Sequence, residues 1–204
     1  TRAAPAGLVS VSAHKFGGPQ GVGALVVREG VVLEAQNLGG GQERGRRSGT
    51  QNVAGIAAMA EAARVTVAER AATVARVSAL RDRLADGITS RLPDVIETAV
   101  PSDADGRRDR SGKVAGSCHL CIGGVENEAL LFLLDQAGVA ASAASSCASG
   151  ALDPSHVLAA IGVERDLAQG SLRLSLGTTT TADEVDVAID AVVASVERLR
   201  RHAA

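Results

Sequence analysis

One long apolar pattern divides this chain into two regions. Between residues 51 and 92, apolar residues recur at spacings of three, four or seven, which is the repeat of an amphipathic helix. Pro93 ends the pattern. The apolar positions of this predicted helix are Val53, Ile56, Ala57, Ala60, Val67, Val74, Leu80, Leu84 and Ile88. The helix separates a short region of strands and loops from a longer region that follows Pro93.

Three strands and a glycine-rich loop are expected before the helix. Residues 8–12 predict a buried strand, and residues 22–27 predict a second one. The second strand leads through Gly30 into residues 31–33, which predicts a hairpin with Gly30 in its turn. The loop that follows, GGGQERGRRSGT at residues 39–50, is rich in glycine and arginine.

After Pro93, predicted strands and helices alternate. The strands are expected at residues 117–122, 139–142 and 172–176, and the helices at residues 125–136, with Gly138 ending the helix, and at residues 155–161. A final helix opens with Thr181 and Glu184 at the spacing of a capping box. Its inward-facing residues are expected to be Val185, Ile189, Val192, Val193 and Val196. Such alternation predicts an α/β layer structure.

Composition restricts the function classes. The 21 Lys and Arg residues nearly balance 23 Asp and Glu residues, and the chain has two Phe, no Tyr and no Trp. Neither a nucleic acid nor an anionic membrane surface is therefore favoured as a partner, and base stacking is a poor expectation. The charged residues 103–113 predict a solvated loop, with a patch for an acidic partner as the alternative.

Location is predicted from apolar runs and cysteines. Asp135 interrupts the most apolar stretch, so we expect no membrane span. Residues 1–7 contain neither Met nor the apolar run of a signal peptide, and three cysteines fit a reducing compartment better than a disulfide framework. The sequence thus predicts a cytoplasmic protein.

A hydroxyl, an imidazole and an amine follow one another at the end of the first strand. Ser12, His14 and Lys15 are followed by glycines, which allow another group to approach closely. Lys15 is either an exposed lysine at a strand end or a Schiff-base lysine, with Ser12 and His14 available to hold a phosphate.

Two further residues are candidates for chemistry. Cys147 lies in a run of Ala, Ser and Gly that offers no obvious apolar cover, so it is either an accessible, reactive thiol or a buried, inert one. Arg173 lies in the middle of a short strand and shares a face with Ser171 and Ser175 by the period of two. It is either a solvated arginine or a bidentate clamp for a substrate carboxylate.

Two further motifs favour a structural role over a chemical one. Cys118-His119-Leu120-Cys121 suggests a zinc or redox site, but residues three apart on a strand point to opposite faces, so the two thiols could share an ion only if the segment turns. Asp153-Pro154 resembles a helix N-cap followed by a first-turn proline, which favours a structural role for His156.

Three motifs in one order resemble the C-terminal half of a cysteine desulfurase, which is a fold-type I enzyme that depends on pyridoxal 5'-phosphate. The motifs are SAHKFGGPQGVGAL, GGGQERGRRSGTQN, and ASAASSCASGALDPSHVLAAIG followed by GSLRLSLG. The resemblance extends over nearly the whole chain. The serine-rich SSCASG segment is similar to the longer-loop branch of the family, which serves iron-sulfur assembly and tRNA thiolation.

The resemblance implies a role for each candidate residue. Lys15 matches the lysine that carries the cofactor and then acts as base, and Ser12 and His14 match the residues that bind its phosphate. Thr50 matches a threonine that reaches the cofactor phosphate of the neighbouring subunit, which implies a homodimer. Finally, Cys147 matches the cysteine that takes sulfur from L-cysteine as a persulfide, and Arg173 matches the arginine that holds the substrate carboxylate.

The resemblance also implies a domain arrangement. Residues 1–65 would complete a large cofactor-binding domain, and residues 66–204 would form a small α/β domain carrying a mobile cysteine loop at about residues 143–153. The sulfur acceptors would be an iron-sulfur scaffold protein or a tRNA thiolation enzyme. No counterpart of the family's N-terminal half is identifiable, so we expect this chain to be part of a larger protein and inactive alone. The alternatives are a non-catalytic half that only dimerises or binds partners, and a zinc module built on Cys118, Cys121 and Cys147.

Overall fold

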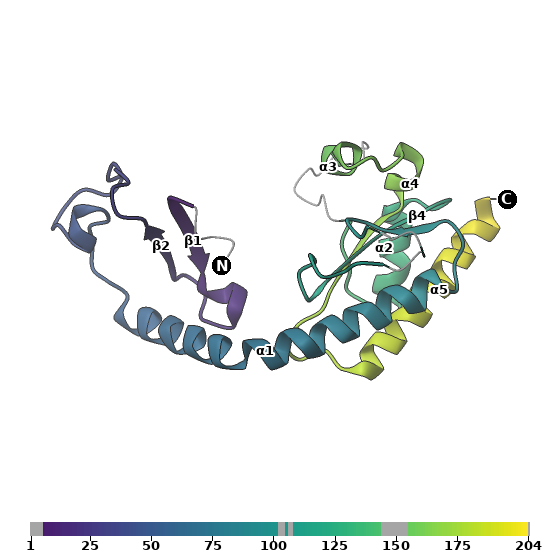
Figure 1. Cartoon of the computed structure of the whole chain (residues 1–204), viewed down its shortest axis with the longest axis horizontal. Helices are drawn as coiled ribbons and strands as arrows, with labels where there is room; N and C mark the ends of the chain where they lie inside the picture. Colours follow the sequence, from purple (N-terminus) through teal and green to yellow (C-terminus); the bar gives the residue numbers. More distant parts are fainter. Residues whose placement is uncertain (1–5, 102–104, 106–107, 144–154, 204) are drawn as a thin grey trace. The chain divides into compact units, whose positions relative to one another are not determined.

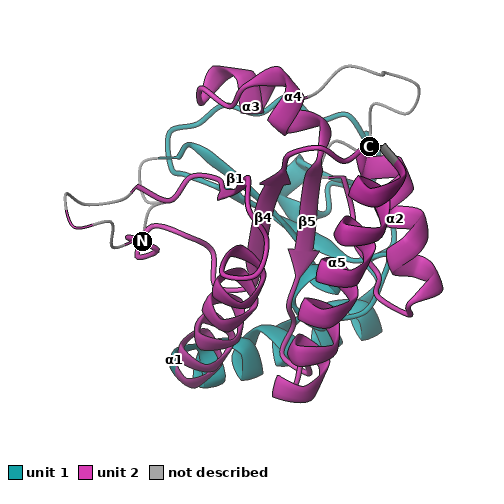
Figure 2. Cartoon of the chain, turned by 90° about the vertical axis from the view of Figure 1, so that its right-hand side faces the viewer, with its two compact units in different colours: residues 1–71 teal, residues 72–204 magenta. Residues whose placement is uncertain are grey.

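The computed structural model describes residues 6–101, 105, 108–143 and 155–203 of the chain (Figure 1). The chain divides into two compact units, Thr1–Ala71 (unit 1) and Ala72–Ala204 (unit 2) (Figure 2). Within the described residues, unit 1 contains a two-stranded sheet and unit 2 a three-stranded sheet. None of the described helices has both the length and the apolar character that crossing a membrane requires.

The sheet of unit 1 is an antiparallel pair. Strand β1 (Leu8–Ser12) and strand β2 (Gly23–Val27) confirm the positions of the two predicted strands and pair along their whole length. Strand β1 is mostly exposed, however, which corrects the expectation of a buried strand. The predicted hairpin between β2 and residues 31–33 is wrong. Gly30 does lie in a turn, with φ of 83°, and the Val31 N–H donates to the Arg28 carbonyl at 3.1 Å. However, β2 pairs with the earlier β1, and residues 31–33 do not form a strand.

The long helix α1 (Val53–Thr89) is present as predicted and ends before Pro93. Its C-terminal part is amphipathic in the expected way, because Leu84 and Ile88 are buried in the core of unit 2. The apolar face of its N-terminal part is uncovered, since the side chains of Val53 and Val67 are 72% and 74% exposed. The predicted apolar face is therefore buried along only part of the helix.

The sheet of unit 2 has the order β3-β4-β5, with antiparallel neighbours. It consists of β3 (Val95–Glu97), β4 (Ser117–Ile122) and β5 (Ser171–Ser175), of which β3 was not predicted. Leu120 and Leu172 point into the main core, which is completed by the end of α1, by α2 (Asn127–Gln136) and by α5 (Ala182–Ala203). Helices α2 and α5 lie side by side next to β4 and β5 (Figure 2). The other sheet face, here called the polar face, carries His119, Ser171 and Arg173, with Cys121 at one end.

Two short helices lie over part of the polar face. Helices α3 (His156–Ala160) and α4 (Arg165–Gln169) contribute Leu158 and Ala168 to a small second core around Cys121. The residue that caps α3 is Ser155, whose Oγ accepts a hydrogen bond from the Val157 N–H at 3.3 Å. This corrects the expectation that Asp153, which lies outside the described residues, is the cap.

The capping box of α5 is confirmed. The Thr181 N–H donates to Glu184 Oε2 at 2.8 Å, and the Glu184 N–H donates to Thr181 Oγ1 at 3.2 Å. The five residues expected to point inward are all buried. This reciprocal pair satisfies two backbone donors that a helix start leaves open.

The predicted strand at residues 139–142 is wrong. The N–H groups of Gly138 and Val139 instead donate to the last carbonyls of α2, on Asp135 and Leu134, at 3.0 and 2.9 Å. Gly138 has the positive φ of 77° that such a helix end requires. The segment's first donors are therefore used to end the helix, and only Ser142 forms a β-bridge, to Arg173.

The charged segment is not simply a solvated loop where the structure describes it. Glu97 ends β3 with a side chain only 1% exposed. Its carboxylate lies 2.7 Å from Arg110 and 2.8 Å from Lys113. Arg110 also lies 2.6 Å from Asp86 of α1. These ion pairs tie the end of the segment to β3 and α1, which corrects the sequence expectation.

Candidate functional site

Ser12, His14 and Lys15 lie where β1 passes into a 3₁₀ helix, η1 (Ala13–Phe16). All three side chains are exposed, and Ser12 Oγ lies 3.3 Å from His14 Nδ1. Ala13 between them is fully buried, and its N–H donates to the carbonyl of Val22 at 3.1 Å. The backbone is thus fixed while a hydroxyl, an imidazole and an amine remain available on neighbouring residues.

The glycines after Lys15 shape this same segment. Gly17 ends η1 with φ of 85°, a conformation that other residues rarely adopt. A Cβ atom on Gly18 would lie 2.9 Å from the Cβ of Ala13, and the Gly18 N–H donates to the Ala13 carbonyl at 2.9 Å. The close approach that the sequence suggested is therefore made by Ala13 itself.

Thr50 follows a loop that is held together by its own side chains. Ser48 is buried, and its Oγ accepts from the Gly41 N–H at 3.2 Å. The Gln42 side chain accepts from the Gly49 N–H at 3.0 Å. Thr50 itself is exposed. The loop therefore presents Thr50 from a fixed backbone in the same unit as Lys15.

Arg173 lies in the middle of β5, opposite the face that carries Leu172 and Leu174, in agreement with the period of two. Its N–H donates to the Ser142 carbonyl at 2.7 Å, and its carbonyl accepts from the Ser142 N–H at 3.1 Å. The side chain is half-buried, and its Nε is buried with no hydrogen-bond partner in the described part of the chain. Because unmet buried donors are rare, this guanidinium is suited to a ligand that accepts hydrogen bonds.

His119 lies on the same sheet face as Arg173, and the sequence motifs gave it no role beside that arginine. Its Nδ1 lies 2.8 Å from Thr98 Oγ1, and its Nε2 lies 3.2 Å from Ser171 Oγ. Burial lowers the pKa of His119, and the nearby charges of Lys113 and Arg173 lower it further. In the sequence, His119 stood out only as part of the possible metal motif Cys118-His119-Leu120-Cys121. Its neighbourhood with Arg173 depends on which strands pair and in which register, and only the structure shows this.

The two cysteines of β4 point to opposite faces, as the strand pattern predicts. Cys118 lies in the main core and Cys121 in the small core under α3 and α4. Burial raises the pKa of Cys118 to about 12 and that of Cys121 to about 11. Both thiols therefore remain protonated near neutral pH. The described residues hold no group of three or more potential metal ligands, and Cys147 lies outside them.

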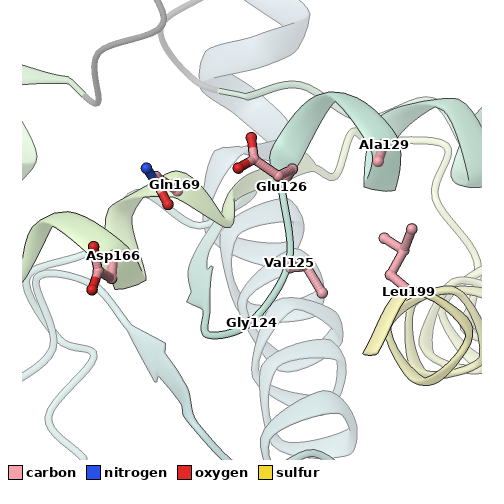
Figure 3. A pocket seen from close by; sticks show the side chains of 7 residues that line it. All are labelled: Gly124, Val125, Glu126, Ala129, Asp166, Gln169 and Leu199. Atoms are coloured by element: carbon pink, nitrogen blue, oxygen red, sulfur yellow. The ribbon is translucent and has the colours of Figure 1, made fainter. Parts of the chain in front are cut away.

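An open pocket of about 380 Å³ lies elsewhere in unit 2, between α2, α4 and α5 (Figure 3). The carboxylates of Glu126 and Asp166 and the amide of Gln169 line it together with apolar side chains. None of the predicted site residues contributes to it.

Known proteins resemble the chain over nearly its whole length. It is 44% identical over 195 residues to an IscS-like cysteine desulfurase of Mycobacterium tuberculosis, which covers 96% of this chain and 48% of that protein. It is 40% identical over 193 residues to the cysteine desulfurase IscS of Clostridium botulinum, which covers 95% of this chain and 47% of that protein. The chain therefore spans about half the length of the curated relatives it matches.

A solved structure and a protein-family model lead to the same assignment as these relatives. A solved NifS-like protein matches the structure with a TM-score of 0.75 at 31% identity, over 94% of this chain and 46% of that one. This likeness confirms the expected α/β fold of fold-type I enzymes. The family model described as aminotransferase class-V matches residues 4–187. This chain belongs to the aminotransferase class-V family.

Proposed function

We propose that the complete polypeptide containing this chain is a cysteine desulfurase, which converts L-cysteine into L-alanine and passes the sulfur to acceptor proteins. The observation that carries this proposal is the 44% identity to an IscS-like cysteine desulfurase over 96% of the chain. Because the chain spans about half of its relatives, we assign the activity to the complete polypeptide and not to this chain alone.

The residues at the end of β1 fit pyridoxal 5'-phosphate, the cofactor of class-V cysteine desulfurases. The Ser12 hydroxyl and the His14 imidazole, 3.3 Å apart, fit a phosphate, and the Lys15 amine fits an aldehyde. When bound, the cofactor supplies an electron sink that acidifies the Cα–H of an amino acid and makes its sulfur transferable. We assign to Lys15 Nζ both the attachment of the cofactor and the acceptance of that proton.

Lysine content supports this assignment. The chain has two lysines, Lys15 and Lys113. The Lys113 side chain is 8% exposed, and its Nζ is held by Glu97 at 2.8 Å and by the Thr98 carbonyl at 3.3 Å. Lys15 is therefore the lysine of this chain with an exposed amine. A nucleophilic amine also needs to be shielded from water. We assign this shielding to the remaining half of the polypeptide.

Arg173 is suited to bind the substrate carboxylate. Its planar guanidinium can donate two parallel hydrogen bonds to a carboxylate, which orients the amino acid as well as holding it. The buried, unpartnered Nε supports this role, because a carboxylate oxygen would satisfy it. A substrate held at this point keeps one fixed orientation while its proton and sulfur are removed.

Cys147 is the proposed sulfur acceptor, although it lies outside the described residues. The new S–S bond forms as the Cβ–S bond of the substrate breaks, and the electron pair of that bond stays with the carbon skeleton, which leaves as alanine after protonation. Cys118 and Cys121 are poor candidates because burial keeps both thiols protonated.

We further propose a cytoplasmic homodimer in which Thr50 reaches the cofactor phosphate of the neighbouring subunit. The internally bonded loop before Thr50 supports this, because a fixed loop can present a side chain to a second subunit. Exposed apolar side chains in unit 1, such as Val53 and Val67, favour coverage by further polypeptide. The sulfur acceptors would be an iron-sulfur scaffold protein or a tRNA thiolation enzyme.

The test compares three cysteine variants of the complete polypeptide. Cys147→Ser should retain bound cofactor but release no alanine from cysteine, because a serine hydroxyl cannot accept sulfur. Cys118→Ser and Cys121→Ser should retain turnover, and mass spectrometry of the wild type should place the added sulfur on Cys147. Normal turnover by Cys147→Ser would refute the assignment of the thiol. A cofactor-loaded wild type that makes no alanine would favour the non-catalytic alternative.

A further inference from the structure

We propose that His119 is a positioning residue for Arg173, which holds the guanidinium in place while leaving its hydrogen-bond donors open to a carboxylate. This inference rests on the proposed function, in which Arg173 binds the carboxylate of L-cysteine. His119 itself touches neither substrate nor cofactor in this account and acts through the arginine.

The strand register brings the two side chains together. His119 of β4 is the direct cross-strand partner of Arg173 of β5. Arg173 uses its backbone N–H and carbonyl on Ser142, and the His119 carbonyl accepts from the Thr98 N–H, so these groups point away from the β4–β5 junction. His119 and Arg173 therefore form the non-hydrogen-bonded type of antiparallel pair, in which Cα atoms approach to about 4.5 Å and side chains on the shared face lie closest.

A directional chain of hydrogen bonds fixes the His119 ring. The Ser171 hydroxyl donates to the Ala143 carbonyl at 3.2 Å, so its oxygen is left to accept from His119 Nε2–H. Nδ1 then carries no proton and accepts from the Thr98 hydroxyl at 2.8 Å. The Thr98 hydroxyl also lies 3.4 Å from the His119 carbonyl, but its contact with Nδ1 is shorter, and this pattern defines a neutral ring with its proton on Nε2.

This arrangement explains why His119 does not compete with a substrate. Burial and the charges of Lys113 and Arg173 lower the pKa of His119, so the ring stays neutral at neutral pH. Both ring nitrogens are already bonded to hydroxyls, so neither is left to accept from the guanidinium. An aspartate or glutamate here would pair with Arg173 and occupy it. The register instead places a neutral ring next to the arginine, whose Nε remains unpartnered among the described residues.

Steady-state kinetics of the complete polypeptide separate positioning from general stability. His119→Ala should raise KM for L-cysteine about ten-fold, which corresponds to one or two net hydrogen bonds, and should leave kcat within about two-fold. His119→Gln retains a donor for Ser171 and should recover most of the loss. Ser171→Ala keeps the ring but removes one partner, and should raise KM by about three-fold. Ser175→Ala, on the same face two residues from Arg173 and exposed, is the matched control and should behave as wild type.

Ligand titration gives a readout that does not depend on turnover. L-Alanine and ethylamine differ by one carboxylate, and their binding is followed by the absorbance of the bound cofactor. His119→Ala should weaken L-alanine binding about ten-fold and leave ethylamine binding unchanged. An unchanged affinity for L-alanine, or an equal loss for both ligands, would overturn the positioning role. A wild type that makes no alanine from cysteine would refute the proposed function, while the titration would still decide the role of His119.

Discussion

Replacing Glu97 by Gln should destabilise unit 2 more than any exposed charge change. The Glu97 side chain is 1% exposed, and its two carboxylate oxygens lie 2.8 Å from Lys113 and 2.7 Å from Arg110. A glutamine fills the same volume but carries no charge. It would leave Lys113, itself 8% exposed, without this carboxylate in a buried place.

The magnitude follows from what each cation retains. Removing one partner of a buried ion pair costs about 3–5 kcal/mol, because the other charge is left uncompensated. Arg110 keeps Asp86 at 2.6 Å, which places the effect near the low end of that range. We therefore expect a loss of about 3 kcal/mol in the free energy of unfolding, which corresponds to a fall of roughly 9 °C in Tm.

The same contacts predict how stability depends on pH. Burial of Glu97 raises the pKa of its carboxyl, but the hydrogen bonds and charges of Arg110 and Lys113 outweigh this and hold the pKa below its ordinary value. A lowered pKa in the folded state means that the ionised form stabilises the fold. This contribution is complete above the pKa of the unfolded chain, about 4.3, and is lost as the pH falls through the lower pKa of the folded protein.

Thermal unfolding of the wild type and of Glu97→Gln, followed by circular dichroism at pH 7 and at acid pH, measures both effects. The matched control is Glu61→Gln, which removes a carboxylate that pairs with Arg64 but is 60% exposed. It should leave Tm unchanged. Equal Tm values for wild type and Glu97→Gln at pH 7, or a difference that does not shrink in acid, would refute the buried ion-pair account.

Two further substitutions test separate parts of the structure. Arg173→Lys should raise KM for L-cysteine by at least ten-fold without loss of bound cofactor, because an ammonium group cannot form the bidentate contact; loss of the cofactor spectrum would instead make Arg173 a structural residue or a phosphate ligand. Thr181→Ala removes the hydroxyl that accepts from the Glu184 N–H at 3.2 Å, and it should cost about 1 kcal/mol in urea unfolding. An unchanged unfolding midpoint for Thr181→Ala would show that the capping box contributes nothing measurable.

Local patterns predicted those elements whose signals lie within one segment. The alternation in β4 and β5 and the period of α1 were sufficient to place these elements to within one to three residues. The capping box of α5 and its inward face were also correct, because residues three and four apart meet on a helix regardless of the rest of the fold.

Predictions failed where bonds to residues outside the segment decide its structure. Residues 31–33 have strand character, but β2 pairs with β1, and this choice depends on long-range pairing. The N–H of Val139 is used to end α2, so the following residues do not extend a strand. Arg110 and Lys113 looked like solvated charges because their buried partner, Glu97, lies on a short strand that the sequence did not reveal.

The candidate site shows the same division. Motif spacing was enough to single out Ser12, His14, Lys15 and Arg173, and the structure places three of them at one strand end. The proposed role of His119 depends on the register between β4 and β5, which makes Arg173 its cross-strand neighbour. Because register is a property of two strands together, neither strand alone could indicate it.

We propose above all that Lys15 carries the cofactor of a cysteine desulfurase. The most direct measurement is borohydride reduction of the cofactor-loaded complete polypeptide, which fixes the cofactor covalently to its lysine, followed by peptide mapping. We expect the label on the peptide that contains Lys15, and no label on the Lys15→Ala protein. Recovery of the label on Lys113 or on any other lysine, or a protein that takes up no cofactor, would contradict this proposal.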